Sequence, residues 1–213
     1  MSQKRSNIYW NSKIIIALVM IGLSVTKLPA QNAQEIIVTI DTVITIDADT
    51  KLVHFNKGEE LREQQKFADA IEEYKLVLSS GNSCGKESEA QYCIGICYLW
   101  MGQFRESESV FKEVLKTYPN DYEAIAFSNY SLSWLDVQNG NLYEAIERLR
   151  KTLDENFYTD EEFCSRAQFQ IGRIYLSYLN DHKSAEKEFR VLLDKYPDSE
   201  YTNHPFVEHL KDR

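Results

Sequence analysis

The residues best suited to metal chemistry are the four histidines, His54, His182, His204 and His209. His204 and His209 stand five positions apart, whereas two ligands on one helix face are better placed four positions apart. The sequence contains no His-Glu-x-x-His pair, no Cys-x-x-Cys, no Gly-x-Ser-x-Gly turn and no glycine-rich phosphate loop. We therefore expect no metal centre, no cofactor and no enzyme activity.

Cysteines and carboxylates are the remaining candidates for chemistry. The even number of cysteines would allow disulfides in an oxidising compartment. Cys93 and Cys97, however, are one helical turn apart, near the upper limit of disulfide geometry, so we expect them to be small buried residues. The acidic residues recur beside Lys or Arg, as with Glu144 and Arg148 at the i,i+4 spacing, which is typical of solvated helix faces. Neither group predicts catalysis.

The charge of the chain argues against two classes of partner. The formal net charge is −9, with 24 Lys+Arg and 33 Asp+Glu. Residues 1–30 contain four basic and no acidic residues, which leaves −13 for the rest of the chain. Such an acidic surface repels phosphate backbones and anionic lipid headgroups, so we expect no nucleic-acid partner and no electrostatic membrane binding.

Residues 1–30 have the three zones of a secretory signal peptide. A basic start precedes an apolar run from Ile14 to Val25, and Ala30 closes the segment. The run is too short to cross a bilayer as a helix, which needs roughly 20 residues. We predict cleavage after Ala30 and an exported product, periplasmic or secreted, with no stable membrane span in the mature chain. The alternative is an uncleaved N-terminal anchor.

Residues 31–49 form a leader before the helical part of the chain. Ile36 to Asp47 is rich in β-branched residues, which favour extended backbone. One interpretation is a strand offered to the sheet edge of another protein, and the other is a flexible leader. The sequence therefore predicts an extended or flexible segment here.

The stretch from Ala90 to Pro119 is patterned as two short antiparallel helices. Gly95 allows a neighbouring helix to approach, and Tyr98 fills the space beside it. Gly102 suits the left-handed turn that ends the first helix, and Pro119 ends the second. This stretch predicts one helical hairpin.

The same pattern recurs along the chain from residue 50. The small residues of the first helices are Gly58, Gly95, Ser131 and Gly172, at spacings of 37, 36 and 41. Those of the second helices are Ala70, Ser107, Ala145 and Ala185, at spacings of 37, 38 and 40. A single hairpin cannot bury its apolar stripe alone, so this period predicts stacked pairs. The expected hairpins are 50–83, 87–120, 123–157 and 164–198, followed by a C-terminal cap at 201–213 that contains a short helix from Pro205 to Lys211.

These residues resemble the tetratricopeptide repeat family. The positions that carry the resemblance in the second hairpin are Ile94, Gly95, Tyr98, Gly102, Phe104, Ser107, Phe111 and Pro119. The resemblance implies an all-α, right-handed solenoid of about four hairpins with a short C-terminal capping helix. The long repeats and the Tyr-Pro endings at Pro119 and Pro197 resemble the bacterial envelope branch of the family, such as the Tol–Pal coordinator and outer-membrane assembly lipoproteins. The third copy departs from the pattern, since it lacks its Gly and its closing Pro.

In this family the first helices line a concave surface, and the resemblance carries that role to particular positions. The residues expected to bind a partner there are Phe55, Tyr92, Ile96, Trp100, Leu132, Arg166, Phe169 and Arg173. An alternative is that some of these aromatic residues belong to the core. The expected function is that of an exported interaction scaffold that binds a peptide or protein segment in its concave groove, with another envelope protein as partner. The alternative function is structural, in self-association or support of a larger complex.

Overall fold

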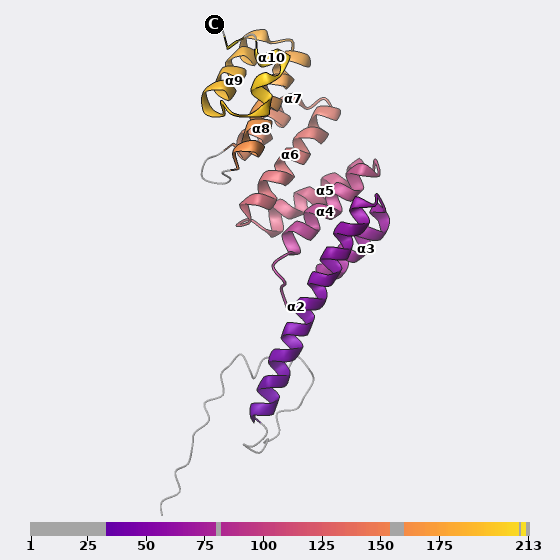
Figure 1. The fold of residues 1–213 in the computed structure, drawn as a ribbon. Coiled ribbons are helices and arrows are strands. Elements are labelled where there is room, and N and C mark those ends of the chain that lie inside the picture. The colour runs from indigo at the N-terminus through magenta and orange to yellow at the C-terminus, as the bar shows by residue number, and fades with distance from the viewer. Residues whose placement is uncertain (1–32, 80–81, 154–159, 209, 212–213) are drawn as a thin grey trace, which may run out of the picture. The chain divides into compact units, whose positions relative to one another are not determined.

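The computed structural model describes residues 33–79, 82–153, 160–208 and 210–211, and these residues are helical or in short connections (Figure 1). The chain divides into two units, 1–47 and 48–213, and the repeats lie in the second. The helices are α2 (Ala33–Glu63), α3 (Phe67–Val77), α4 (Glu87–Trp100), α5 (Phe104–Thr117), α6 (Tyr122–Gln138), α7 (Leu142–Thr152), α8 (Glu161–Ser177) and α9 (His182–Lys195), with η1 (Glu200–Asn203) and α10 (Pro205–Glu208) after them.

Within the second unit the helices pair as hairpins, and each hairpin packs on the next. The paired helices are α4 with α5, α6 with α7, and α8 with α9, while α3 contacts α4, α5 contacts α6, and α7 contacts α8. The last part of α2 pairs with α3, since Phe55 and Tyr74 place their ring centroids 5.9 Å apart. The predicted all-α fold of stacked hairpins is confirmed.

A residue with positive φ joins the two helices of each hairpin. These residues are Gln65, Gly102, Gly140 and Asn180, with φ of 60°, 73°, 80° and 51°. A left-handed residue satisfies the last carbonyls of a helix while it reverses the chain. The turns therefore recur in register with the repeats, although only two of the four use glycine.

Three hairpins place a glycine of the first helix against an aromatic ring of the second. The pairs are Gly58 with Tyr74, Gly95 with Phe111, and Gly172 with Phe189. A Cβ built on Gly95 would lie 2.5 Å from Cε1 of Phe111, so the ring occupies the space that a side chain would need. The glycine predicted to allow close approach at Gly95 has this role.

The third hairpin corrects the predicted register. Its small residue opposite the second helix is Ser133, not Ser131: Ser133 stands seven residues before the turn at Gly140, as Gly95 stands seven before Gly102. Ser133 also lines the same small cavity as Leu149 of α7. The sequence alignment matched aromatic residues and so slipped by two positions.

In this register, Asp136 of the third hairpin takes the position of Tyr98 in the second. Its Oδ2 lies 2.6 Å from Nε of Arg148 in α7. Both side chains are partly buried. An ion pair thus joins the two helices where the second hairpin uses an aromatic side chain.

The leader differs from the sequence-based expectation. Residues 36–47 lie in α2 and are not extended. β-Propensity depends strongly on having neighbouring strands, whereas a helix satisfies its own backbone hydrogen bonds. A β-branched segment without a partner strand therefore takes the helical conformation here.

The C-terminal segment covers the last hairpin, as predicted. The helix α10 is shorter than the expected 205–211, and η1 precedes it. Val207 and Leu210 are buried and belong to a core cluster with Phe169, Phe189 and Leu192. The predicted signal peptide at 1–30 lies outside the described residues. Among the helices that the structure describes, none combines the length and apolarity needed to cross a membrane.

Candidate functional site

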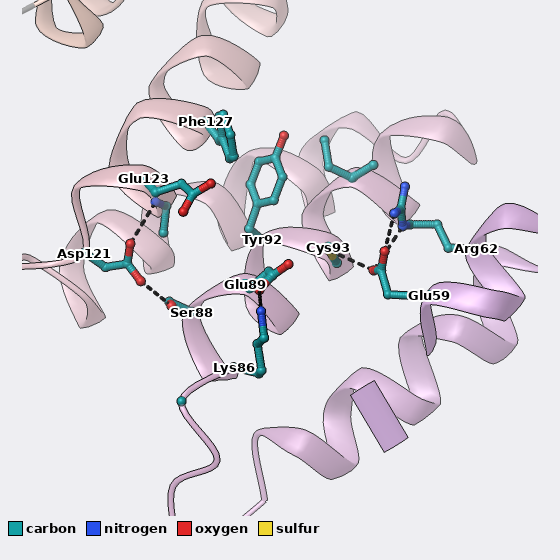
Figure 2. Close-up of a pocket in the computed structure, with 13 residues that line it drawn as sticks. Glu59, Arg62, Lys86, Ser88, Glu89, Tyr92, Cys93, Asp121, Glu123 and Phe127 are labelled. Carbon is teal, nitrogen blue, oxygen red and sulfur yellow. Dashed lines mark hydrogen bonds and ion pairs between the residues drawn. The ribbon is translucent and has the colours of Figure 1, made fainter. Parts of the chain in front are cut away.

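A cavity of about 490 Å³ opens on the first helices of the first three hairpins (Figure 2). Its lining residues come from α2, α4, the connection before α4, and the start of α6; they are Glu59, Arg62, Gly85, Lys86, Ser88, Glu89, Tyr92, Cys93, Ile96, Asp121, Glu123, Ala124 and Phe127. First helices of successive hairpins thus share one surface, as the resemblance implied. We call this lining the inner-face cavity.

The floor of the inner-face cavity is aromatic and aliphatic. Tyr92 and Phe127 face one another in Figure 2, with ring centroids 5.6 Å apart. Tyr92 also packs on the buried Phe111, at 5.5 Å. Burial raises the pKa of Tyr92 to about 12, against a smaller opposing effect of its hydrogen bond with Ser131. The phenol is therefore neutral at physiological pH, and the floor offers a partner apolar surface with one hydroxyl group.

A polar network closes the side of the cavity formed by α2. Glu59 accepts hydrogen bonds from Arg62 and from the hydroxyl of Tyr74, and Sγ of Cys93 lies 3.5 Å from its Oε1. Burial alone would raise the pKa of Glu59, but the hydrogen bonds from Arg62 and Tyr74 lower it below its ordinary value. Burial also raises the pKa of Cys93 well above that of an ordinary thiol. The network holds an ionised carboxylate and an unreactive thiol.

The opposite side of the cavity is acidic. Asp121 accepts a hydrogen bond from the Ser88 hydroxyl and another, at 3.0 Å, from the backbone N–H of Ala124 at the start of α6. Oε2 of Glu89 lies 2.5 Å from Nζ of Lys86. Glu123 is exposed and makes no salt bridge within the described part of the chain. Asp121 thus has a local structural role, whereas Glu123 offers a carboxylate to solvent.

Three of the residues predicted to bind a partner lie in the core instead. Phe55, Leu132 and Phe169 are 5%, 2% and 4% exposed, so they are not accessible to a partner. Phe55 packs on Tyr74, and Leu132 packs in a cluster with Phe111. The prediction for these three residues is wrong because neighbouring helices, and for Phe169 also the C-terminal segment, cover them.

The other predicted site residues keep some access to solvent. Tyr92 and Ile96 line the inner-face cavity. Trp100 is 70% exposed at the end of α4. Arg166 donates through Nε to the hydroxyl of Tyr201, at 3.1 Å, and Arg173 lines a second cavity between α6 and α8. Their role in binding remains a prediction.

The sequence reasoning missed three residues of α6 because of the register shift. With Ser133 in place of Ser131, the inward positions of the third hairpin become Phe127, Tyr130 and Trp134. Phe127 lines the inner-face cavity, and Tyr130 and Trp134 line the cavity between α6 and α8. The constant distance from the small residue to the turn glycine was the signal that would have found them.

No metal centre is assembled by the part of the chain described here, since no group of three or more His, Cys, Asp and Glu side chains comes together. Cys93 and Cys97 are buried in α4, as predicted. The residues of the inner-face cavity are arranged for contact and hydrogen bonding.

These features define a class of protein built from helical repeats, in which stacked first helices form a surface for protein interaction. The tetratricopeptide repeat family supplies the more specific match: its model matches residues 89–121 and 166–199, which cover most of the second and fourth hairpins. Over these two segments the chain is similar to tetratricopeptide repeats. No curated protein sequence is significantly similar to the chain.

Solved structures of other helical-repeat proteins share the fold. MamA AMB-1 is 16% identical with a TM-score of 0.52, and the match covers 76% of this chain and 81% of MamA. A MamA RS-1 double mutant is 19% identical with a TM-score of 0.53, covering 77% and 86%. YrrB, described as a TPR protein with an unusual peptide-binding site, is 15% identical with a TM-score of 0.53, covering 94% and 90%. At this identity the likeness shows the fold alone.

Proposed function

We propose that the chain is a non-enzymatic interaction scaffold that binds a segment of another protein in the inner-face cavity. The observation that carries the proposal is the cavity itself, about 490 Å³ in volume, with Tyr92, Ile96 and Phe127 at its floor and polar groups around it. Apolar anchors surrounded by polar groups are typical of sites that bind peptide side chains.

The polar rim supports binding of a peptide rather than catalysis. Glu59 is held by Arg62 and Tyr74, and Asp121 caps α6, so these carboxylates are already engaged. The thiol of Cys93 is kept protonated by burial. The cavity can therefore bind a ligand through apolar contacts and hydrogen bonds.

Site-directed photo-crosslinking tests the proposal in cells that express the chain. A photoreactive phenylalanine analogue replaces Glu89, which is exposed at the cavity, and in a control variant it replaces Lys112, which is exposed on the second helix α5. We expect an adduct with a partner protein from position 89 and not from position 112. Equal adducts at both positions, or none at position 89, would reject the inner-face cavity as the binding site.

The chain is further proposed to be exported, with a mature N-terminus at Gln31. The support is the basic start, the short apolar run and Ala30 in the sequence. Such a chain would meet its partner in the cell envelope or outside the cell. N-terminal sequencing of the chain recovered from its natural compartment tests this, and an N-terminus upstream of Ile14 would indicate an anchored protein.

The structural alternative, self-association, is favoured by exposed aromatic residues near the hairpin turns. Trp100 and Tyr143 are 70% and 68% exposed. A single exposed aromatic residue is common on protein surfaces, whereas several exposed aromatic residues close together can form an interface between two copies of the chain. Light scattering during size-exclusion chromatography decides: a monomer at micromolar concentration rejects self-association as the main role.

A further inference from the structure

Acidic charge is in excess at the inner-face cavity. Four carboxylates and two basic side chains line it, and both basic side chains are engaged: Arg62 by Glu59, and Lys86 by Glu89. The remaining carboxylates are Asp121 and Glu123. A ligand at this end of the inner face meets a negative potential, which favours a basic side chain.

The other end of the inner face has the opposite charge. A smaller cavity of about 100 Å³ lies between α6 and α8; its lining is Tyr130, Ser133, Trp134, Val137, Gln138, Leu149, Gln170, Arg173, Ile174 and Tyr178. Arg173 is the sole charged residue of this lining. Its Nε is buried and has no hydrogen-bond partner among the described residues. A buried donor without an acceptor is costly, which leaves this guanidinium incompletely satisfied. Because Arg173 is half-buried and lines the cavity, a carboxylate that enters the cavity would form a strong, charge-assisted hydrogen bond with the guanidinium.

Aromatic side chains connect the two ends. Phe127 of the first cavity contacts Phe163 of α8, with ring centroids 4.8 Å apart, and Phe163 contacts Tyr130 of the second cavity, at 5.3 Å. Glu123, Phe127, Tyr130 and Trp134 follow one face of α6, at spacings of four, three and four residues. The inner face therefore runs from acidic through aromatic to basic along this helix.

The helix also sets a length for the ligand. Glu123 and Trp134 are eleven residues apart in α6, which corresponds to roughly 16 Å at a rise of about 1.5 Å per residue. An extended segment rises about 3.3 Å per residue, so about five residues span this interval. A peptide of that length would reach both cavities.

We infer that the inner face binds an extended segment with a basic side chain at Glu123, apolar side chains over Phe127 and Tyr130, and an acidic side chain at Arg173. Trp134 and Arg173 line the same cavity, so the two charged residues of the ligand are about five positions apart. The basic residue lies at the Glu123 end and the acidic residue at the Arg173 end. This inference rests on the proposed function and deepens it, because it specifies the chemistry of the partner segment.

Selection from a random library of displayed 12-residue peptides tests the inference on the full chain. We expect the selected peptides to share a Lys or Arg and an Asp or Glu about five positions apart, with apolar residues between them. In Glu123→Lys the enrichment of the basic residue should fall more than tenfold, and in Arg173→Glu the enrichment of the acidic residue should fall likewise. Matched reversals on the second helices, Glu113→Lys and Arg190→Glu, should leave the selected pattern unchanged.

The outcomes separate this inference from the function on which it rests. Two outcomes overturn the charge assignment and leave the binding site standing. In one, the selected peptides no longer bind Phe127→Ala but lack the charged pair; in the other, they no longer bind Phe127→Ala but keep the charged pair in selections on both reversal variants. Selection of no peptide that depends on Phe127 overturns both. If Arg173→Glu does not fold by circular dichroism, Arg173→Gln replaces it, and an unchanged preference for an acidic residue then contradicts the inference.

Discussion

Substitution of Gly95 by alanine should destabilise the second hairpin, although alanine is the better helix former. The new Cβ would lie 2.5 Å from Cε1, 2.8 Å from Cδ1 and 3.0 Å from Cζ of Phe111. Carbon atoms in contact are normally about 3.5–4.0 Å apart, so the ring must move. Phe111 is fully buried and has no solvent-exposed space to move into.

The magnitude follows from two opposing effects. Overpacking a close-packed core costs about 1–3 kcal/mol. Replacing glycine by alanine within a helix contributes about 1 kcal/mol in favour of folding. Because the clash involves three atoms of one rigid ring, we expect the clash to exceed the gain, with a net loss of up to about 2 kcal/mol in the free energy of unfolding.

The third hairpin supplies a control and a rescue. Ser133 already carries a Cβ at the matching position, in the same cavity lining as Leu149, so Ser133→Ala introduces no clash. It should cost only the hydrogen bond from the Ser133 hydroxyl to the Tyr130 carbonyl, about 1 kcal/mol. Phe111→Leu in the Gly95→Ala background imitates that pair of residues. The double variant should be more stable than the sum of the single changes predicts, because the smaller side chain makes room for the new methyl group.

Urea unfolding of the full chain, followed by circular dichroism, measures these differences. We compare the urea midpoints of Gly95→Ala, Phe111→Leu, the double variant and Ser133→Ala. The comparison reports stability where the variants share the same m-value, the slope of the free energy of unfolding against urea concentration. A Gly95→Ala chain as stable as the unmodified chain would refute the reasoning. Additive effects of the Gly95 and Phe111 substitutions would show that the two residues are not coupled through this contact.

Further predictions concern three other features. Trp100→Ala should lower the melting temperature less than Tyr98→Ala, since Trp100 is 70% exposed and Tyr98 packs on the core of the first two hairpins, and equal melting curves would contradict this. Arg148→Ala should destabilise by about 1–3 kcal/mol because it leaves the partly buried Asp136 without its partner, whereas replacing both by apolar residues should be milder in a double-mutant cycle. The lowered pKa of Glu59 contributes stability above the ordinary value of 4.5 that is lost as the pH falls through the lowered value, so Glu59→Gln should show a shallower loss of stability in acid titrations of unfolding.

Local patterns in the sequence determined most of the fold. A small residue opposite a large one, a turn residue seven or eight positions later and a closing proline together specify a helical hairpin, and a hairpin with an apolar face must stack to bury it. The period therefore predicted four hairpins, and Pro205 with the apolar stripe after it predicted a C-terminal segment over the last one. Tyr92 and Ile96 were found at the inner-face cavity because the second hairpin follows the family pattern most closely.

The tertiary structure decided what depends on neighbours. Residues 36–47 have β-branched side chains but lie in a helix, because side-chain preference is weaker than the need to satisfy the backbone. Ser131 and Ser133 are equally small, so residue size in the sequence could not set the register of the third hairpin. The shared cavity lining of Ser133 and Leu149, and the turn at Gly140, set it. Phe55, Leu132 and Phe169 are core residues because other helices cover them. The sequence pattern around a residue does not show which other part of the chain will cover it.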